Sequence, residues 1–351
     1  MPSRHHILVC GGAGYIGSHM CKALAAAGMV PVTFDNFSTG HRAAVRWGPL
    51  VEGDLLDRPS LASAFAAWPV RAVLHFAARS LVGESVREPG LYFRNNVAGT
   101  LNLLDAMRDA GVERLVFSST AAVYGDPVYT PIDEAHPTSP INPYGWSKLM
   151  AEREIAEYCR AHGLRAACLR YFNAAGADPA CETGEAHEPE THLIPNLLRA
   201  ALAPAAADDA MGGAPASIFG DDYDTPDGTC VRDYIHVADL CAAHLLALDR
   251  LEAVPGVQVF NLGGGQGSSV AEVLAVCRDV SGAPIPERRL PRRPGDPAVL
   301  VASAGAAARD LGWRPRYGLR DCVAHALAWE RKRQGVAVDV SAGAGATDAC
   351  A

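Results

Sequence analysis

The stretch ILVCGGAGYIG, residues 7–17, decides the fold of this chain. Its four apolar residues predict a buried strand, and Gly11, Gly14 and Gly17 follow where that strand passes into a helix. Glycine lets the backbone turn tightly and approach a pyrophosphate, and the free N–H groups of a helix amino terminus attract phosphate. The stretch therefore predicts a dinucleotide site.

Short apolar runs and helical periodicity alternate from this stretch to about residue 170. The expected strands are residues 7–10, 32–35, 72–76, 115–118 and 166–170, and the expected helices are residues 16–27, 58–68, 91–110 and 143–162. Such alternation predicts an α/β fold, a Rossmann-type doubly wound parallel sheet with helices on both faces. Ligands of such sheets bind at the carboxyl ends of the strands.

The second half of the chain is less regular, with clusters of Pro and Gly between shorter elements. We expect residues 1–172 to form the cofactor domain and residues 173–335 to form a smaller α/β lobe that binds substrate. Within that lobe, residues 201–216 predict a helix end followed by a mobile loop, because they combine alanines with acidic pairs and glycines. The small, polar residues 336–351 predict a disordered tail.

Composition limits the classes of function. The chain has 351 residues and a formal net charge of -8, which argues against a protein that tracks nucleic acid or an anionic membrane. Neither a secretory signal nor an apolar run of about 18 residues is evident, so we expect a cytoplasmic protein without a membrane span. The 10 cysteines show no metal-binding or disulfide spacing. We therefore expect reduced, buried cysteines and no metal site.

Two aspartates extend the cofactor site. Asp35 ends the second strand 18 residues beyond Gly17, where a carboxylate receives the ribose hydroxyls of NAD and repels the 2′-phosphate of NADP. A helix cap or turn is the alternative role for Asp35. Asp54 follows the third strand and is expected to reach the adenine amino group, with a helix N-cap as the alternative. The expected cofactor is NAD.

Tyr144 and Lys148 are expected to act on one point, because residues four apart share a face of a helix. Asn142 and Pro143 supply the cap and first turn of that helix. A phenol ordinarily titrates near 10, so a base of this kind needs a neighbouring cation, and Lys148 is one of only three lysines among 31 basic residues. Thr120 ends a strand and can share the proton of the substrate with the tyrosine. A surface lysine beside a half-buried tyrosine is the alternative.

The chain resembles the extended short-chain dehydrogenase/reductase superfamily and, within it, the UDP-glucose 4-epimerases, over residues 7–330. The shared motifs are residues 11–19, 75–78, 82–85, 95–100, 117–125, 170–173, 191–195, 218–236 and 293–296. The resemblance implies a tightly held NAD, a UDP-sugar substrate, a transient 4-keto sugar and a homodimer built on the helices at residues 91–110 and 143–162.

The resemblance also assigns residues. The expected cofactor contacts are Gly11, Gly14, Tyr15, Ile16, Gly17, Asp35, Asn36, Asp54, Leu55, Phe76, Ala77, Ala78, Asn95, Ser118, Tyr144, Lys148 and Tyr171. The expected substrate contacts are Thr120, Asn173, His192, Leu193, Ile218, Phe219, Arg232, Arg293, Asp296 and Leu300. Two arginines suit a diphosphate, which an acidic protein must neutralise locally.

Two positions depart from the family pattern. Family members often carry a lysine near position 80, where this chain has Arg79-Ser80. Leu300 lies where some members carry tyrosine and others a small residue, so 2-acetamido sugars stay open as substrates beside UDP-glucose and UDP-galactose. A pentose 4-epimerase, a 4,6-dehydratase and a non-catalytic NAD-binding protein also stay open. Ala121-Ala122 after Thr120 argues against the dehydratase, since neither side chain can move a proton.

Overall fold

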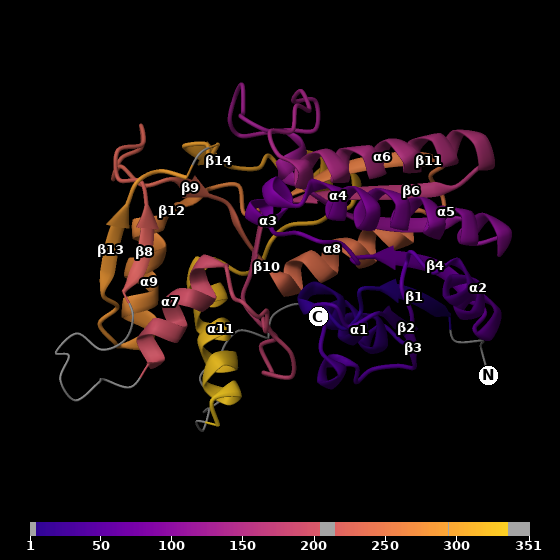
Figure 1. Cartoon of the computed structure of the whole chain (residues 1–351), viewed down its shortest axis with the longest axis horizontal. Coiled ribbons are helices and arrows are strands. Elements are labelled where there is room, and N and C mark those ends of the chain that lie inside the picture. The colour runs from indigo at the N-terminus through magenta and orange to yellow at the C-terminus, as the bar shows by residue number, and fades with distance from the viewer. Residues whose placement is uncertain (1–4, 204–214, 294, 336–351) are drawn as a thin grey trace, which may run out of the picture.

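The computed structural model describes residues 5–203, 215–293 and 295–335 (Figure 1). A larger lobe surrounds a central sheet, and a smaller lobe lies at one end of it, containing α7 (Leu193–Leu202), α9 (Val270–Ser281) and α11 (Leu319–Arg333). The predicted tail at residues 336–351 and most of the loop predicted within residues 201–216 lie outside the described residues.

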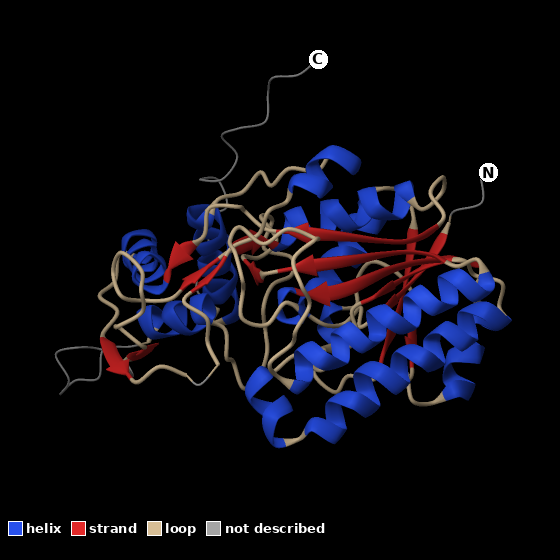
Figure 2. Cartoon of the chain, turned by 90° about the horizontal axis from the view of Figure 1, so that it is seen from above, coloured by secondary structure: helices blue, strands red, loops and turns tan. Residues whose placement is uncertain are grey.

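The central sheet has seven parallel strands in the order β11-β6-β5-β4-β1-β2-β3. Their bounds are β1 His6–Cys10, β2 Val30–Asp35, β3 Leu50–Glu52, β4 Val70–His75, β5 Arg114–Thr120, β6 Arg165–Tyr171 and β11 Gly256–Leu262. The predicted parallel sheet is thus confirmed. In Figure 2 the strand arrows point toward the smaller lobe, so the carboxyl ends of the strands face it.

Helices cover both faces of the sheet, as predicted. On one face α1 (Tyr15–Ala26) and α8 (Val237–Arg250) pack on residues such as Val9 and Leu74. On the other face α2 (Arg58–Ala67), α5 (Gly99–Asp109) and α6 (Pro143–His162) pack on Leu8 and Phe117. Alternate residues of each strand point to opposite faces, so one strand contributes to both cores.

The helix predicted at residues 91–110 is not a single α-helix. Short helices α3 (Val82–Arg87) and α4 (Pro89–Tyr92) come first, and a π-helical segment, Phe93–Ala98, joins α4 to α5. The prediction of one uninterrupted helix was wrong, because apolar periodicity over this length does not reveal one widened turn.

The smaller lobe has its own core between α7 (Leu193–Leu202), α9 (Val270–Ser281) and α11 (Leu319–Arg333). Its short strands form three small sheets, β10-β7, β12-β9-β14 and β13-β8. Their bounds are β7 Asn173–Ala175, β8 Ala216–Phe219, β9 Val231–Arg232, β10 Tyr234–His236, β12 Ser268–Ser269, β13 Glu287–Leu290 and β14 Val299–Leu300. The remaining helix is α10, Gly305–Asp310.

The second half of the chain also returns to the larger lobe. Strand β11 pairs with β6 along its whole length, and α8 packs beside α1 on the central sheet. The division of the chain at residue 172 stays a prediction, and the structure adds that β11 and α8 belong to the central sheet although they follow that boundary.

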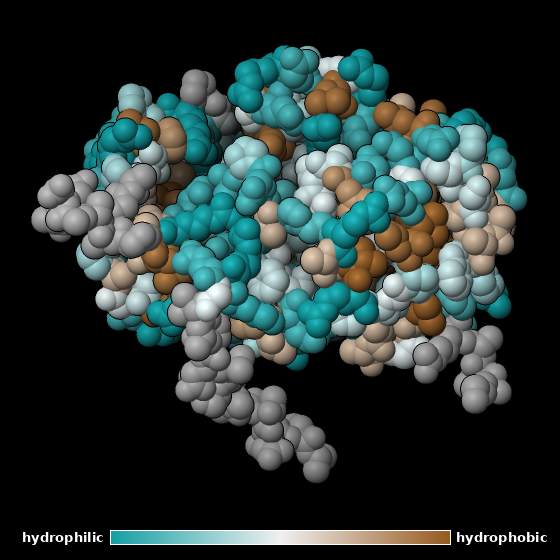
Figure 3. All heavy atoms as spheres, turned by 60° about the horizontal axis from the view of Figure 1, so that its bottom comes forward, coloured by the Kyte–Doolittle hydropathy of each residue, from teal (hydrophilic) through white to brown (hydrophobic). Residues whose placement is uncertain are grey.

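All nine cysteines within the described residues are free and buried, as the irregular spacing predicted. Each helix of the described ranges is too short or too polar to traverse a bilayer. The face shown in Figure 3 is mostly hydrophilic, with hydrophobic side chains in separate patches.

Candidate active site

A cavity of about 1470 Å³ lies at the carboxyl ends of the central strands and extends into the smaller lobe. All of the predicted cofactor contacts line it, together with Thr120, Asn173, His192, Leu193, Phe219, Arg232, Arg293 and Asp296. Residues separated by most of the chain therefore share one site. Two predicted substrate contacts, Ile218 and Leu300, do not line this cavity.

The glycine turn requires glycine at two positions. Gly11 has a φ of +81°, and a Cβ there would lie 2.6 Å from the backbone nitrogen of Ala77. A Cβ on Gly17 would lie 2.0 Å from the carbonyl oxygen of Gly11. Both distances are too short for a side chain, so the turn packs backbone against backbone and leaves the start of α1 open to the cavity.

Asp35 is a buried carboxylate that organises the edge of the same cavity. Its oxygens accept hydrogen bonds from the backbone N–H groups of Ala13 at 2.9 Å and Phe37 at 2.8 Å. Burial raises the pKa of Asp35, while these hydrogen bonds oppose that rise. The turn role considered as the alternative is therefore real, yet the same side chain also faces the cavity.

Asn36 and Asp54 form the neighbouring wall. The amide of Asn36 donates to Asp54 Oδ2 at 2.8 Å, and the backbone N–H of Leu56 donates to Asp54 Oδ1 at the same distance. Asp54 thus serves a local turn rather than the helix N-cap expected as its alternative role, because the N-cap residue of α2 is Asp57. Its presence in the cavity wall keeps the other role available.

Tyr144 lies in the first turn of α6, and it lines the cavity together with Thr120 at the end of β5. Burial raises the pKa of Tyr144, and the hydroxyl of the nearby Thr120 opposes that increase. A cation bound in the cavity is what would make the phenol acidic.

Lys148 is buried one turn further along α6. Its ammonium donates to the carbonyl oxygen of Ser118 at 2.8 Å and lies 4.8 Å from the ring centre of Phe117. Burial lowers the pKa of Lys148 to about 7, although Glu152 opposes this. The hydroxyl of Ser118 is also hydrogen-bonded to the hydroxyl of Tyr171, so Ser118 at the end of β5 contacts both Lys148 and Tyr171.

The π-helical segment contributes a connection that the sequence did not reveal. Asn96 is buried, and its amide oxygen accepts from the backbone N–H of Arg79 at 2.9 Å. Its amide nitrogen donates to Ser147 on α6, also at 2.9 Å. The widened turn thus ties the segment after β4 to the helix that carries Tyr144, which agrees with the frequent occurrence of π-bulges at functional sites.

The smaller lobe places two arginines in the cavity wall. Arg232 is buried and paired with Asp296, while the guanidinium of Arg293 stacks 3.9 Å from the ring centre of Phe219. A planar guanidinium with several N–H donors suits the oxygens of a diphosphate. Arg79 pairs with Glu84 at 3.6 Å, and both Arg79 and Ser80 line the cavity.

Ile218 and Leu300 require correction. Ile218 is buried in the core of the smaller lobe, and its neighbour Phe219 faces the cavity, because adjacent strand residues point to opposite sides. Leu300 packs against the cluster that contains Ala121 and Tyr124 rather than lining the cavity.

Several cavity residues were not predicted. They include Ser38, Thr39, Arg79, Ser80, Glu185, His187, Asn196, Arg199 and Tyr234. Glu185 and His187 offered a signal, since an acid and a histidine two residues apart precede His192 by a few positions. This signal was not used, because the segment was interpreted as an irregular connection rich in Pro and Gly.

Comparison with known proteins agrees with this geometry. Residues 7–263 match the model of the NAD dependent epimerase/dehydratase family. The chain belongs to this family. The match runs from the second residue of β1 to just beyond the end of β11, so it includes all of the central sheet except His6.

Members of the family with known names resemble the chain along nearly its full length. It is 49% identical to the UDP-glucose 4-epimerase of Halalkalibacterium halodurans, over 93% of this chain and 96% of that protein. The Brucella ovis UDP-glucose 4-epimerase, solved in complex with NAD, has a TM-score of 0.86 at 47% identity and covers 92% and 97% of the two chains. The Bifidobacterium longum enzyme, solved with NAD+ and UDP, has a TM-score of 0.86 at 36% identity, covering 94% and 99%.

Proposed function

We propose that this protein is an NAD-dependent epimerase that interconverts UDP-glucose and UDP-galactose by inverting the configuration at C4. One observation carries the proposal: the phenol of Tyr144 lies in a cavity that has the glycine turn on one side and the arginines of the smaller lobe on the other. The names of the relatives support the same activity.

The residues of the larger lobe fit NAD. The glycine turn and the open start of α1 suit a pyrophosphate, and the buried Asp35 suits ribose hydroxyls. When bound, NAD supplies reversible hydride transfer to and from C4 of the sugar. The chain itself must hold the reacting atoms and move the proton.

Tyr144 is the proton-transfer group. Its phenolic oxygen accepts the proton of the sugar O4 hydroxyl when C4 is oxidised and returns that proton when C4 is reduced. Thr120 lines the same cavity, and its hydroxyl can share the proton. The hydrogen bond from Lys148 to Ser118 holds this basic group one turn after the tyrosine on the same helix.

The smaller lobe holds the UDP group in this proposal. Arg232 and Arg293 neutralise the diphosphate, and Asn173, His192, Leu193, Phe219 and Asp296 contribute the remaining contacts. The division at residue 172 is part of this assignment, with cofactor contacts before it and nucleotide-sugar contacts mainly after it. A cavity of about 1470 Å³ leaves room for the 4-keto sugar to turn its other face toward the hydride donor.

The direct test gives the purified protein UDP-galactose without added NAD. Formation of UDP-glucose supports the proposal, because net oxidation is zero and the bound cofactor is regenerated. A 4-keto-6-deoxy product would identify a dehydratase. The absence of any product, with NAD bound, would contradict catalysis.

Epimerisation of 2-acetamido sugars is a second candidate activity, because the reaction at C4 is the same. One solved relative is a UDP-Glc/GlcNAc 4-epimerase from Campylobacter jejuni, which is 39% identical to this chain. Leu300, the residue expected to restrict 2-acetamido sugars, does not line this cavity. Turnover of UDP-GlcNAc beside UDP-glucose tests this second activity.

A homodimer and a cytoplasmic location complete the proposal. Helices α5 and α6 run side by side on one face of the sheet (Figures 1 and 2). They expose Leu101, Trp146 and Met150, of which the last two are four residues apart on α6. Apolar side chains on two adjacent helices suit a symmetric contact with a second copy of the chain.

A further inference from the structure

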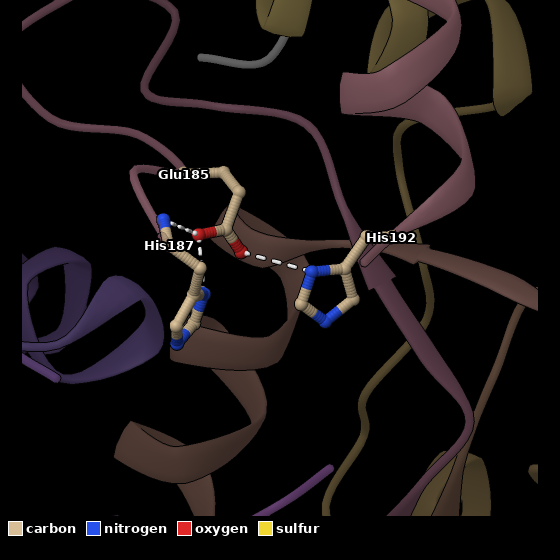
Figure 4. A group of neighbouring side chains, drawn as sticks. All are labelled: Glu185, His187 and His192. Atoms are coloured by element: carbon tan, nitrogen blue, oxygen red, sulfur yellow. Dashed lines mark hydrogen bonds and ion pairs between the residues drawn. The ribbon is translucent and has the colours of Figure 1, made fainter. Parts of the chain in front are cut away.

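Glu185, His187 and His192 lie together in the cavity wall, on the segment between β7 and α7 (Figure 4). The carboxylate of Glu185 lies between the two imidazole rings. His187 Nδ1 is 2.5 Å from one carboxylate oxygen, and His192 Nδ1 is 3.7 Å from the other. The side chain of Glu185 is 7% exposed, so an acid with two histidine neighbours is almost withdrawn from solvent.

Neighbouring contacts hold this segment in place. Trp329 donates from its ring nitrogen to the carbonyl oxygen of Glu185 at 2.8 Å, and a ring nitrogen of His41 lies 2.9 Å from the carbonyl oxygen of Ala186. The backbone N–H groups of Ala186 and His187 donate to the Glu185 carboxylate at 2.7 and 2.9 Å. The carboxylate is thus oriented by its own segment, as the ligands of metal sites are.

The spacing of the ligand atoms is suited to a small cation. One nitrogen or oxygen from each of the three side chains lies within 4.8 Å of the others. Tetrahedral zinc with bonds of about 2.0–2.1 Å places its ligand atoms roughly 3.3 Å apart, so small side-chain rotations would complete the site. The Nδ1 atoms of both rings already face the carboxylate oxygens, and they would have to move apart slightly to admit an ion.

A second carboxylate supports the outer histidine. Glu190 accepts from His192 Nδ1 at 2.7 Å, and its side chain is 1% exposed. Its other oxygen is buried and has no hydrogen-bond partner among the described residues. Glu190 binds the same nitrogen of His192 that faces Glu185, so an ion bound through Nδ1 would take the place of this hydrogen bond.

We propose that Glu185, His187 and His192 form a binding site for a divalent transition-metal ion, with Zn²⁺ as the expected ion. Two imidazoles and one carboxylate are a ligand set that zinc accepts, and they leave a coordination position for water or for an oxygen atom of a ligand in the cavity. Because the three residues line the cavity, the ion has a path from solvent. The site contains no cysteine, so cysteine spacing could not have predicted it.

The test titrates chelator-treated protein that retains its NAD with Zn²⁺ alone, using calorimetry. We expect one equivalent to bind to the wild-type chain, and Glu185→Gln and His187→Ala to weaken that binding at least tenfold. His162→Ala is the matched control, since this exposed histidine lies at the end of α6, outside the cavity wall. Its Zn²⁺ binding should equal that of the wild type.

Co²⁺ provides an independent reading of the ligands. The proposal is supported if Co²⁺ bound to the wild type absorbs visible light without a thiolate-to-metal charge-transfer band, and if this absorption is lost in His187→Ala. Wild-type protein that binds no Zn²⁺, variants that bind it as tightly as the wild type, or a thiolate signal would each overturn the proposal.

Thermal melting and the NAD content of each variant show whether it is folded. Because His187 is partly exposed, its replacement should be tolerated. No enzymatic assay enters this test, so its failure and that of the proposed epimerase activity are separable.

Discussion

Lys148 donates a hydrogen bond of 2.8 Å to the carbonyl oxygen of Ser118, which joins helix α6 to the end of strand β5. Thr120 lies two residues further along that strand, and Tyr144 lies one helical turn before Lys148, so both side chains line the cavity beside this contact. This geometry sets the phenol at the carboxyl edge of the sheet, beside the cavity where a nicotinamide and a sugar can meet.

Replacing Tyr144 by Phe removes the proton-transfer oxygen while keeping the ring. We expect kcat to fall by about 10²–10⁴-fold, the usual contribution of general acid–base catalysis. NAD should remain bound, because the glycine turn and Asp35 are unaffected. Coupled measurement of UDP-glucose formation, with NAD released by denaturation and quantified, checks both parts. Turnover close to that of the wild type would remove the tyrosine from its proposed role.

Arg232→Met tests the proposed diphosphate contact. A lost charge-assisted hydrogen bond costs about 1.5–3 kcal/mol, which corresponds to an increase in KM for the UDP-sugar of roughly 10–100-fold, with a smaller change in kcat. Arg288→Met is the matched control, because Arg288 is an exposed residue of β13 that does not line the cavity. Steady-state kinetics of both variants give the comparison. Equal KM values for both variants and the wild type would contradict the assignment.

We expect Glu154 to make the free energy of unfolding depend on pH. Its carboxylate lies on α6, one oxygen is buried without a hydrogen-bond partner in the described structure, and burial raises its pKa to about 7. The unfolded chain releases this proton near pH 4.5, so between about pH 4.5 and 7 the folded state binds more protons. Glu154 therefore makes the free energy of unfolding decrease as pH rises through this range.

Glu154→Gln should abolish that contribution. Urea unfolding at pH 5 and pH 8 is the measurement, and the wild type should lose more stability between these conditions than the variant does. Glu88→Gln, which changes an exposed carboxylate, serves as the control and should follow the wild type. A variant with the same pH dependence as the wild type would show that Glu154 is solvated or paired in solution.

The proposed dimer surface can be tested by placing a charge in it. Trp146 is 45% exposed on α6, and Trp146→Glu should convert a dimer into a monomer because a carboxylate would become buried at the contact. Leu246→Glu alters an apolar residue of α8 that is 38% exposed and belongs to the helix layer on the opposite side of the sheet. Light scattering after gel filtration measures the mass of each. A wild-type monomer, or a dimer unaffected by Trp146→Glu, would exclude this surface.

Local signals predicted several elements closely. Helix α6 begins at Pro143 and ends at His162, as expected, because each end has its own chemical cause. The side chain of Asn142 accepts from the backbone N–H of Gly145 at 2.9 Å, and Gly163 ends the helix with a φ of 72°. A cap and a terminating glycine act over a few residues, so the sequence alone displays them.

Contacts between segments that are distant in the sequence could not be predicted from local patterns. Strand β11 pairs with β6, although the two strands begin 91 positions apart, at Gly256 and Arg165. An apolar strand shows its period but not its partner, because the pairing depends on the positions of the other layers. For the same reason, the sequence did not show that Ile218 faces the core and Phe219 faces the cavity.

The sequence by itself determined the kind of chemistry: a glycine turn, an acid at the end of the second strand, and a tyrosine and lysine one helical turn apart. These are short-range patterns whose residue types and spacing carry the information. Only the tertiary structure decided that residues from both halves share one cavity, that Leu300 lies behind its wall, and that Glu185 lies between two histidines. Those relationships arise when separate layers pack against one another, and packing places side chains in contact without regard to their distance along the chain.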